Sequence, residues 1–349
     1  YIFSVAAFSA STLVTSGIDF CIRAARAVFR LKRRSLRRFG MAKMEPGAEA
    51  YFEGKYVPTE QAKISILTHA FNYGTGLFEG IRAYYNADED NVLIFRLNEH
   101  IDRFVRNFRI LQMEIPESFE DLVGICVELS KRTGWREDIY IRPICYKSEH
   151  SLGPKLNGIQ SSFCCWVIKL GDYVEINDGL DVAVASWRRL SDNAIPSRAK
   201  TTGSYINSAL ARSETDLAGF DEAIVLREDG SVAEGSAMNL FMILDGKLVT
   251  PPPTADILVG ITRNTVMELA QNELGLEVIE RPVSRTELYV CDELFFTGTG
   301  AQVAPVRSVD RRTIGEGRPG PITKKLQDLY FQVVQGRVAK YRHWCTPVY

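Results

Sequence analysis

Short apolar runs and longer amphipathic runs alternate along the chain from about residue 51 onward. The short runs are rich in β-branched and aromatic residues and are bounded by Asp, Asn or Gly, which is typical of strands. Six of them are expected as strands: residues 92–95, 139–142, 164–168, 223–226, 239–244 and 293–296.

Two longer runs have the period of a helix. One has apolar residues at positions 101, 104, 105, 108 and 111, behind a possible N-cap at Asn98. The other has them at 266, 269 and 270, behind Thr262, and stops at Leu274 and Gly275. Strands that alternate with helices in this way predict an α/β protein of the α+β type.

The length of 349 residues suits two domains. A turn-rich, polar stretch near Leu170 separates the first group of strands and helices from the next. We therefore expect a small N-terminal α/β domain over residues 41–169, an interdomain loop over 170–178, and a larger C-terminal domain over 179–349.

Residues 1–40 differ from the rest of the chain in charge. They carry eight Lys or Arg and one acid, Asp19, whereas the remainder carries 34 basic and 42 acidic residues. Because Met41 directly precedes the first globular-looking segment, we expect residues 1–40 to be upstream translation or a disordered leader outside the mature protein. An Arg-rich organelle transit peptide is the second interpretation, and a nucleic-acid-binding arm is a distant third. The expected location is the cytoplasm, or an organelle if that second interpretation holds.

Charge and composition exclude several classes of function. Residues 41–349 carry a net negative charge, which does not favour binding to nucleic acid. No apolar run is long enough to span a bilayer. The four histidines are not paired at ligand spacing, so no metal site is expected. Cys164 and Cys165 are neighbours in a predicted strand and should face opposite sides, so we expect reduced thiols rather than a disulfide between them.

A lysine, a downstream carboxylate and two Gly/Thr turns follow one another in the second half of the chain. Lys200 lies in a short segment of small residues, and Glu234 follows 34 positions later. Each alone has an ordinary explanation, as a surface lysine or a strand-end carboxylate. Together they are the groups that a pyridoxal phosphate site needs: an amine to form a Schiff base with the cofactor aldehyde, and a carboxylate to keep the pyridine nitrogen protonated.

The two turns offer backbone N–H groups to a phosphate. Gly260, Ile261 and Thr262 immediately precede a predicted helix, whose N-terminus favours an anion. The TGTG sequence at 297–300 offers a second group of amides. A dinucleotide fold is a weak alternative for that sequence, because no third glycine follows at the required place.

From about residue 50 to about residue 341 the chain resembles the branched-chain amino-acid aminotransferases, which are fold-type IV pyridoxal-phosphate enzymes. The matching segments are residues 69–84, 99–103, 140–143, 199–205, 234–239, 260–263 and 297–300, including FEGIR at 78–82, KTTGSY at 200–205 and EGSAMN at 234–239. Their order and spacing also match.

The resemblance implies a role for each of these residues. Lys200 would carry pyridoxal 5'-phosphate and shuttle the proton, Glu234 would pair with the pyridine nitrogen, and Tyr205 would hydrogen-bond the phenolic oxygen. The implied phosphate ligands are Arg103, Ile261, Thr262 and Thr299, and the implied substrate-side residues are Tyr73, Phe78, Arg142, Tyr173 and Gly300. Arg103 otherwise lies off the apolar face of its helix, where a solvated side chain is usual.

The resemblance also implies the reaction and the assembly. The amino group of L-leucine, L-isoleucine or L-valine would pass to 2-oxoglutarate, giving branched-chain 2-oxo acids and L-glutamate. Aromatic walls suit the aliphatic side chain, and an arginine at the rim such as Arg142 suits the second carboxylate of the acceptor. Because some pocket residues in this family come from the neighbouring subunit, a homodimer or higher homo-oligomer is expected.

Two departures from the family pattern concern the substrate side. Residues 151–156 read SLGPKL where several members carry a Gly-Val-Asn-Pro loop, and Leu170 stands where an aromatic often occurs. They keep open an amine transaminase on the same scaffold. D-amino-acid aminotransferases and aminodeoxychorismate lyases share the cofactor residues, but FEGIR at 78–82 and Arg142 favour the branched-chain enzymes. A binding or regulatory protein with a vestigial site is disfavoured by the joint presence of the cofactor residues.

Overall fold

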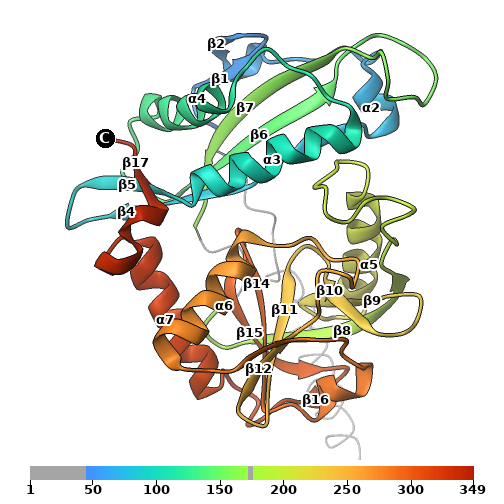
Figure 1. Ribbon diagram of the computed structural model, residues 1–349, viewed down its shortest axis with the longest axis vertical. Coiled ribbons are helices and arrows are strands. Elements are labelled where there is room, and N and C mark those ends of the chain that lie inside the picture. The colour runs from blue at the N-terminus through green and yellow to red at the C-terminus, as the bar shows by residue number, and fades with distance from the viewer. Residues whose placement is uncertain (1–44, 172–175) are drawn as a thin grey trace, which may run out of the picture. The chain divides into compact units, whose positions relative to one another are not determined.

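The structure is a computed structural model, and it describes residues 45–171 and 176–349 (Figure 1). The described residues belong to one compact unit, Met44–Tyr349. The proposed leader at 1–40 and the expected start at Met41 lie outside the described residues, as does Tyr173. The described part contains no helix that is both long and apolar enough to cross a membrane.

The first sheet is antiparallel and has the strand order β17-β5-β4-β6-β7-β1-β2, with β3 paired to β6. Its strands are β1 (Glu49–Phe52), β2 (Lys55–Pro58), β3 (Gly76–Phe78), β4 (Ile81–Asn86), β5 (Asn91–Phe95), β6 (Ile139–Lys147), β7 (Ser161–Lys169) and β17 (Cys345–Pro347). The long hairpin of β6 and β7 alternates buried and more exposed residues, as expected for a sheet with one covered face.

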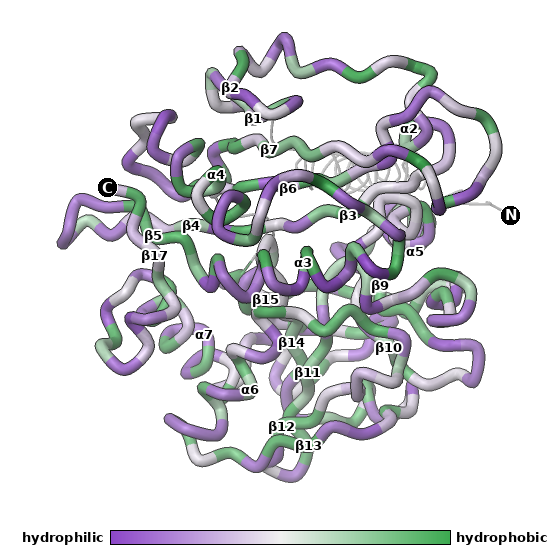
Figure 2. The backbone as a smooth tube through the Cα atoms, turned by 45° about the horizontal axis from the view of Figure 1, so that its top comes forward, coloured by the Kyte–Doolittle hydropathy of each residue, from purple (hydrophilic) through white to green (hydrophobic). Residues whose placement is uncertain are grey.

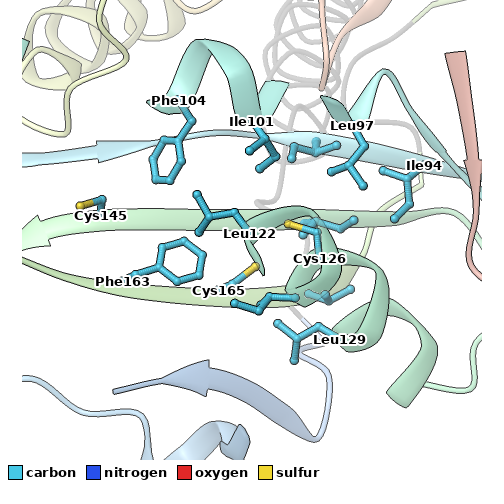
Figure 3. Close-up of a cluster of buried hydrophobic side chains, with 14 of the residues drawn as sticks. Ile94, Leu97, Ile101, Phe104, Leu122, Cys126, Leu129, Cys145, Phe163 and Cys165 are labelled. Carbon is cyan, nitrogen blue, oxygen red and sulfur yellow. The ribbon is translucent and has the colours of Figure 1, made fainter. Parts of the chain in front are cut away.

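Two helices, α3 (Leu97–Leu111) and α4 (Phe119–Arg132), cover that face. Ile101 and Phe104 of α3 and Leu122 of α4 meet Phe163 and Cys165 of β7 in one buried cluster (Figure 3). A capping box formed by Ser118 and Asp121 begins α4. Figure 1 shows α3 on the side of this sheet that faces the second sheet.

The second sheet is mixed and has the strand order β10-β9-β8-β15-β14-β11-β12-β13, with β16 paired to β15. Its strands are β8 (Leu180–Arg188), β9 (Glu222–Leu226), β10 (Val232–Gly235), β11 (Asn239–Leu244), β12 (Lys247–Thr250), β13 (Val278–Glu280), β14 (Glu293–Gly298), β15 (Gln302–Val309) and β16 (Arg312–Thr313). The central strands β11 and β14 are hydrophobic along most of their length (Figure 2). They are buried on both faces, since Phe295 and Phe296 enter two different core clusters.

Helices cover the second sheet as well. The helix α5 (Tyr205–Leu217) packs on β8 and β9, while α6 (Ile261–Leu274) and α7 (Pro321–Val334) pack on β14. The remaining helices are short: α2 (His69–Tyr73), η1 (Thr59–Gln61), η2 (Arg285–Tyr289) and η3 (Ala339–Trp344).

All six predicted strands are present, and the α+β character is confirmed. Both predicted caps are wrong. Asn98 lies inside α3, which begins directly after β5 with Arg96 in a left-handed conformation at the N-cap. Thr262 is the second residue of α6, whose N-cap is Gly260, while the predicted end at Leu274 and Gly275 is correct.

The boundary predicted at 170–178 falls between β7 and β8. These strands are consecutive in the sequence, and β7 belongs to the first sheet and β8 to the second. The last strand, β17, returns to pair with β5 in the first sheet, a crossing that the sequence did not suggest. The division into two domains itself stays a prediction. Cys164 and Cys165 are both free, and only Cys165 is fully buried, in agreement with their opposite facing.

Candidate active site

Lys200 lies between two turns, in a segment whose backbone bonds to β3. Its carbonyl accepts a hydrogen bond of 3.0 Å from the N–H of Phe78, and the next residue, Thr201, bridges to Leu77. The approach is close because Gly74 and Gly203 touch: a Cβ at Gly74, which has φ +66°, would lie 2.8 Å from the Cα of Gly203. The backbone around Lys200 is therefore fixed by the first sheet.

The Lys200 amine meets two aromatic side chains. Its Nζ donates to the hydroxyl of Tyr205, the first residue of α5, at 2.5 Å, and lies 4.9 Å from the ring centre of Phe78. The rings of Phe78 and Tyr205 are themselves 4.9 Å apart. Three predicted site residues are thus brought together from β3, the Lys200 segment and α5.

Glu234, on β10, is a buried carboxylate with two side-chain partners. Arg189 forms an ion pair with its Oε1 at 2.8 Å, and Asn239 Nδ2 donates to its Oε2 at 2.8 Å. Burial raises the pKa of Glu234, although the charges of Arg189 and Lys200 oppose that effect. A carboxylate with a raised pKa is a strong acceptor for a charged N–H donor.

Asn239 also ties Glu234 to the beginning of α6. Its Nδ2 donates to the carbonyl of Leu258 at 2.8 Å, and a Cβ at Gly260 would lie 2.2 Å from its Oδ1. A larger residue at that position would therefore have to displace the Asn239 amide. Ile261 and Thr262 begin α6, and no described side chain caps its N-terminus, so the first N–H groups of this helix are available to an anion.

The second predicted turn, Thr299 and Gly300, connects β14 to β15. The carbonyl of Gly300 accepts a hydrogen bond of 3.2 Å from the buried Arg82, which also donates to the carbonyl of Gly171 at 2.8 Å. Thr297, opposite Asn239 in the sheet, is fully buried, and its hydroxyl has no hydrogen-bond partner within the described ranges.

Arg103 extends from α3 toward the turn before α6. Its Nη1 donates to the carbonyl of Val259 at 2.7 Å, and its Nε and Nη2 bind Glu79. The side chain is mostly buried, contrary to the solvated position expected from the helical pattern. The reason is a polar stripe on the same face of α3, in which His100, Arg103 and Asn107 follow at spacings of three and four.

Arg142, on β6, packs against the Phe78 ring. Its guanidinium carbon lies 4.4 Å from the ring centre of Phe78, and its Nη2 donates to the hydroxyl of Tyr140 at 2.6 Å. The same guanidinium carbon lies 5.4 Å from the ring centre of Trp166, which is opposite Arg142 on β7. Among residues 45–171 and 176–349, no carboxylate forms an ion pair with Arg142.

Tyr73 is not brought into this group. It lies at the end of α2, where its hydroxyl accepts a hydrogen bond from the N–H of Gly153 at 3.1 Å and its ring packs on His69. Tyr73 is 37% exposed. The cofactor-side residues and Phe78, Arg142 and Gly300 thus belong to one connected region, whereas Tyr73 lies on an outer surface.

Sequence reasoning missed five side chains that hold the predicted ones in place: Glu79, Arg82, Trp166, Arg189 and Asn239. Three of them lie inside or next to motifs that had drawn attention. The polar stripe on α3 was a signal for Glu79, since buried polar residues on a helix need a partner. Nothing local indicated Arg189 or Trp166.

The model of the family described as amino-transferase class IV matches residues 76–309. A probable branched-chain-amino-acid aminotransferase from Aquifex aeolicus is 50% identical over 300 residues, which cover 86% of this chain and 96% of that protein. This chain belongs to the branched-chain aminotransferases of class IV. The family, the fold class and the aminotransferase activity predicted from the sequence are confirmed.

Solved structures of other branched-chain aminotransferases are similar throughout. The enzyme from Thermoproteus uzoniensis with norvaline is 40% identical, with a TM-score of 0.83, and covers 87% of this chain and 100% of its own. The T.th. enzyme complexed with N-(5'-phosphopyridoxyl)-L-glutamate is also 40% identical, with a TM-score of 0.83, and covers 87% and 99%. The aminotransferase described here therefore matches both over nearly their whole length.

Proposed function

We propose that this aminotransferase moves the amino group of L-leucine, L-isoleucine or L-valine to 2-oxoglutarate, reversibly, with pyridoxal 5'-phosphate held on Lys200. The observation that carries the proposal is that an amine and a guanidinium both lie against the ring of Phe78. Lys200 Nζ is 4.9 Å and the Arg142 guanidinium carbon 4.4 Å from its ring centre. The ring of Phe78 thus lies beside both the Lys200 amine, which would take part in amino-group transfer, and the Arg142 guanidinium, which would bind the second carboxylate of 2-oxoglutarate.

The relatives support both ends of this reaction. One was solved with norvaline, an unbranched aliphatic amino acid, and another with a phosphopyridoxyl derivative of L-glutamate. A pocket that accepts both an aliphatic side chain and a carboxylate needs apolar walls and one cation. Phe78 and Arg142 have those properties here.

The residues of this site fit pyridoxal phosphate. An uncapped helix N-terminus, a buried and unpartnered Thr297 hydroxyl, and Arg103 directed at Val259 form, among the described residues, a set of donors suited to a phosphate. The buried carboxylate of Glu234 lies within the electrostatic influence of Lys200. Arg103, Ile261, Thr262 and Thr299 would hold the phosphate, and Glu234 the pyridine nitrogen.

When bound, pyridoxal phosphate supplies an aldehyde for amines and a ring that withdraws electrons from the α-carbon of the substrate. Lys200 supplies the amine that holds it and then the base that removes the α-proton of the amino acid. In the described part of the chain, Lys200 is the lysine whose amine lies beside both Phe78 and Tyr205. The hydroxyl of Tyr205 accepts a hydrogen bond of 2.5 Å from Lys200 Nζ and so orients the amine.

Glu234 keeps a proton on the ring nitrogen. Its raised pKa makes it a better acceptor than an ordinary glutamate, and the charge of Arg189 opposes the effect of burial. Arg189 holds one carboxylate oxygen and Asn239 the other, so the orientation of the carboxylate that would bind the pyridine nitrogen is fixed. Asn239 links this carboxylate to the segment that leads into α6, because it bonds to both Glu234 and the carbonyl of Leu258.

A homodimer would complete the substrate side. Several apolar side chains are exposed on neighbouring segments: Ile66, Leu67 and Phe71 near α2, Leu152 in the 151–156 loop, and Ile206 on α5. Gly153 bonds to Tyr73, and Gly203 bonds to Gly74, so these segments adjoin. Phe71 is 65% and Leu152 91% exposed, which is costly in water and favourable at an interface. Tyr73 and this loop would then serve the pocket of the partner subunit.

The test is a panel of amino donors assayed with 2-oxoglutarate, together with the mass of the purified protein by analytical ultracentrifugation. Branched-chain L-amino acids should be the best donors, and the mass should be that of at least two chains. A protein that prefers D-amino acids or primary amines would refute the substrate proposal and leave the cofactor site standing. A monomer with full activity would refute the dimer.

A further inference from the structure

Glu79 is a fully buried carboxylate that the roles assigned so far do not use. It directly follows Phe78, and its backbone N–H donates to the carbonyl of Pro143 at 3.0 Å. Since successive residues of an extended segment point to opposite sides, Phe78 turns toward Lys200 while Glu79 turns toward α3. One short strand therefore delivers a pocket wall and a buried charge.

Three hydrogen bonds from α3 satisfy this carboxylate. Arg103 Nε donates to Oε1 at 2.7 Å and Arg103 Nη2 donates to Oε2 at 2.8 Å, which is the parallel two-bond arrangement of an arginine with a carboxylate. His100 Nδ1 donates to Oε2 at 2.8 Å. His100 and Arg103 reach the same group because they are three residues apart on one helix face.

Glu79 is held in its charged form. Burial alone would raise its pKa, but the charge and hydrogen bonds of Arg103 and His100 outweigh burial and bring the pKa far below the usual range. The ion pair of Glu79 with Arg103 is thus favoured in the folded protein. Its geometry, rather than its titration, is what the site can exploit.

The pairing leaves Arg103 with a defined set of donors. A guanidinium has five N–H groups, and here one on Nε and one on Nη2 are bound to Glu79, while one on Nη1 is bound to the carbonyl of Val259. One N–H remains on each terminal nitrogen. Val259 immediately precedes Gly260 and the start of α6, so the remaining donors are held beside the predicted phosphate turn.

We propose that Glu79 is a positioning residue for the cofactor phosphate and acts through Arg103. This inference rests on the proposed function, in which Arg103 is a phosphate ligand. Glu79 orients the guanidinium fork before the phosphate arrives, so that binding does not have to order a long side chain. Because the Arg103–Glu79 pair has no net charge, it would bind the phosphate through directed hydrogen bonds from Arg103 rather than through net positive charge.

The experiment measures the dissociation constant of pyridoxamine 5'-phosphate for the full-length protein freed of cofactor. This ligand carries the phosphate but no aldehyde, so covalent attachment to Lys200 does not enter the result. Glu79→Gln should weaken binding about tenfold or more, because a neutral amide cannot hold both guanidinium nitrogens. His100→Leu disturbs the same buried cluster without touching Arg103, and it should change the constant by less than about threefold.

A double variant separates positioning from general damage. In an Arg103→Met background, Glu79→Gln should have almost no further effect, because the side chain through which Glu79 acts is gone. Independent losses that multiply, an unchanged constant in Glu79→Gln, or an equal loss in His100→Leu would each overturn the proposal. Glu79→Asp, which keeps the charge but shortens the reach, serves if Glu79→Gln does not fold, and it should also weaken binding. A wild-type protein that does not bind the ligand would refute the proposed function itself.

Discussion

The cofactor side and the substrate side of the site are built differently. On the cofactor side each charged group is buried and already bonded to another protein group: Glu234 to Arg189 and Asn239, and Arg103 to Glu79. On the substrate side, Arg142 is held by a tyrosine hydroxyl and aromatic faces, without a carboxylate among the described residues. The charged groups of the cofactor side therefore pair with other protein groups, whereas the Arg142 guanidinium of the substrate side can still pair with a carboxylate of a ligand.

This difference corresponds to what each side is proposed to bind. The cofactor is the same in every turnover, so rigid pairs made in advance cost nothing in versatility and reduce the ordering needed on binding. The substrate side must accept an aliphatic side chain in one half-reaction and a carboxylate in the other. An arginine stabilised by rings can serve both, because the rings hold it in place while its charge stays available.

The largest effect is expected from Lys200→Ala. Loss of the amine removes both the attachment point and the base, so turnover should fall by about a thousandfold or more. The measurement is the rate of leucine and 2-oxoglutarate conversion with added cofactor. Turnover within about tenfold of wild type would mean that another group acts as the base.

Glu234→Gln tests the cofactor side next. A neutral amide cannot keep the ring nitrogen protonated, so the rate should fall about ten- to a hundredfold while cofactor remains bound. Glu222→Gln is a matched control, because Glu222 is also buried, also near an arginine, and also has its pKa raised by burial. Equal rate losses in both variants would point to structural damage instead of a role at the ring.

Arg142→Ala tests the substrate side. Loss of an arginine–carboxylate contact costs about 1.5–3 kcal/mol, so the specificity constant for glutamate and 2-oxoglutarate should fall about ten- to a hundredfold. For leucine the loss should be smaller. If both substrates lose equally, Arg142 binds the shared α-carboxylate or supports the fold.

Trp166→Leu should act in the same direction with a smaller effect. Its indole faces the Arg142 guanidinium from the neighbouring strand, and such a contact contributes about 0.5–2 kcal/mol. The specificity constant for glutamate should fall about two- to thirtyfold, with leucine less affected and with Trp166→Phe close to wild type. A Phe variant as poor as the Leu variant would contradict a role for the aromatic face.

The smallest effect concerns His100 and pH. Burial lowers the pKa of His100, although the neighbouring Glu79 opposes it, so the folded protein keeps the ring neutral where the unfolded chain takes up a proton. Stability conferred by this site should therefore fall as pH drops from about 7 to 5, by at most about 1.4 kcal/mol per pH unit. Urea unfolding of wild type and His100→Leu across that range should show the difference shrinking toward acid. A difference independent of pH would contradict the shift.

Sequence reasoning found what is local. Lys200, Glu234 and the start of α6 lie in short motifs whose chemistry can be recognised without a fold, and in the structure the charge of Lys200 acts on Glu234. The strands were recognisable because they are short apolar runs, rich in β-branched and aromatic residues and bounded by Asp, Asn or Gly. The caps predicted at Asn98 and Thr262 were wrong because these helices begin after Arg96, which is left-handed, and after Gly260, which is extended. Neither N-cap residue has a side-chain capping bond from the described residues.

The partners of these residues were not predictable, because they depend on tertiary contacts. Arg82 reaches the carbonyl of Gly300 across 218 positions, and Arg103 reaches Val259 across 156. Trp166 faces Arg142 only through the register of β6 and β7, which the sequence does not specify. The structure therefore adds mainly the contacts between residues that are far apart in the sequence, which the short motifs do not reveal.

Borohydride reduction of the cofactor-loaded protein, followed by peptide mapping, tests the central claim most directly. The label should lie on Lys200, whose amine is held beside Tyr205 and Phe78. The strongest competitor by burial is Lys147, whose amine instead donates to the carbonyls of Gln112 and Ile159. A label on the Lys200 peptide supports the account, and a label on Lys147 or any other lysine would contradict it.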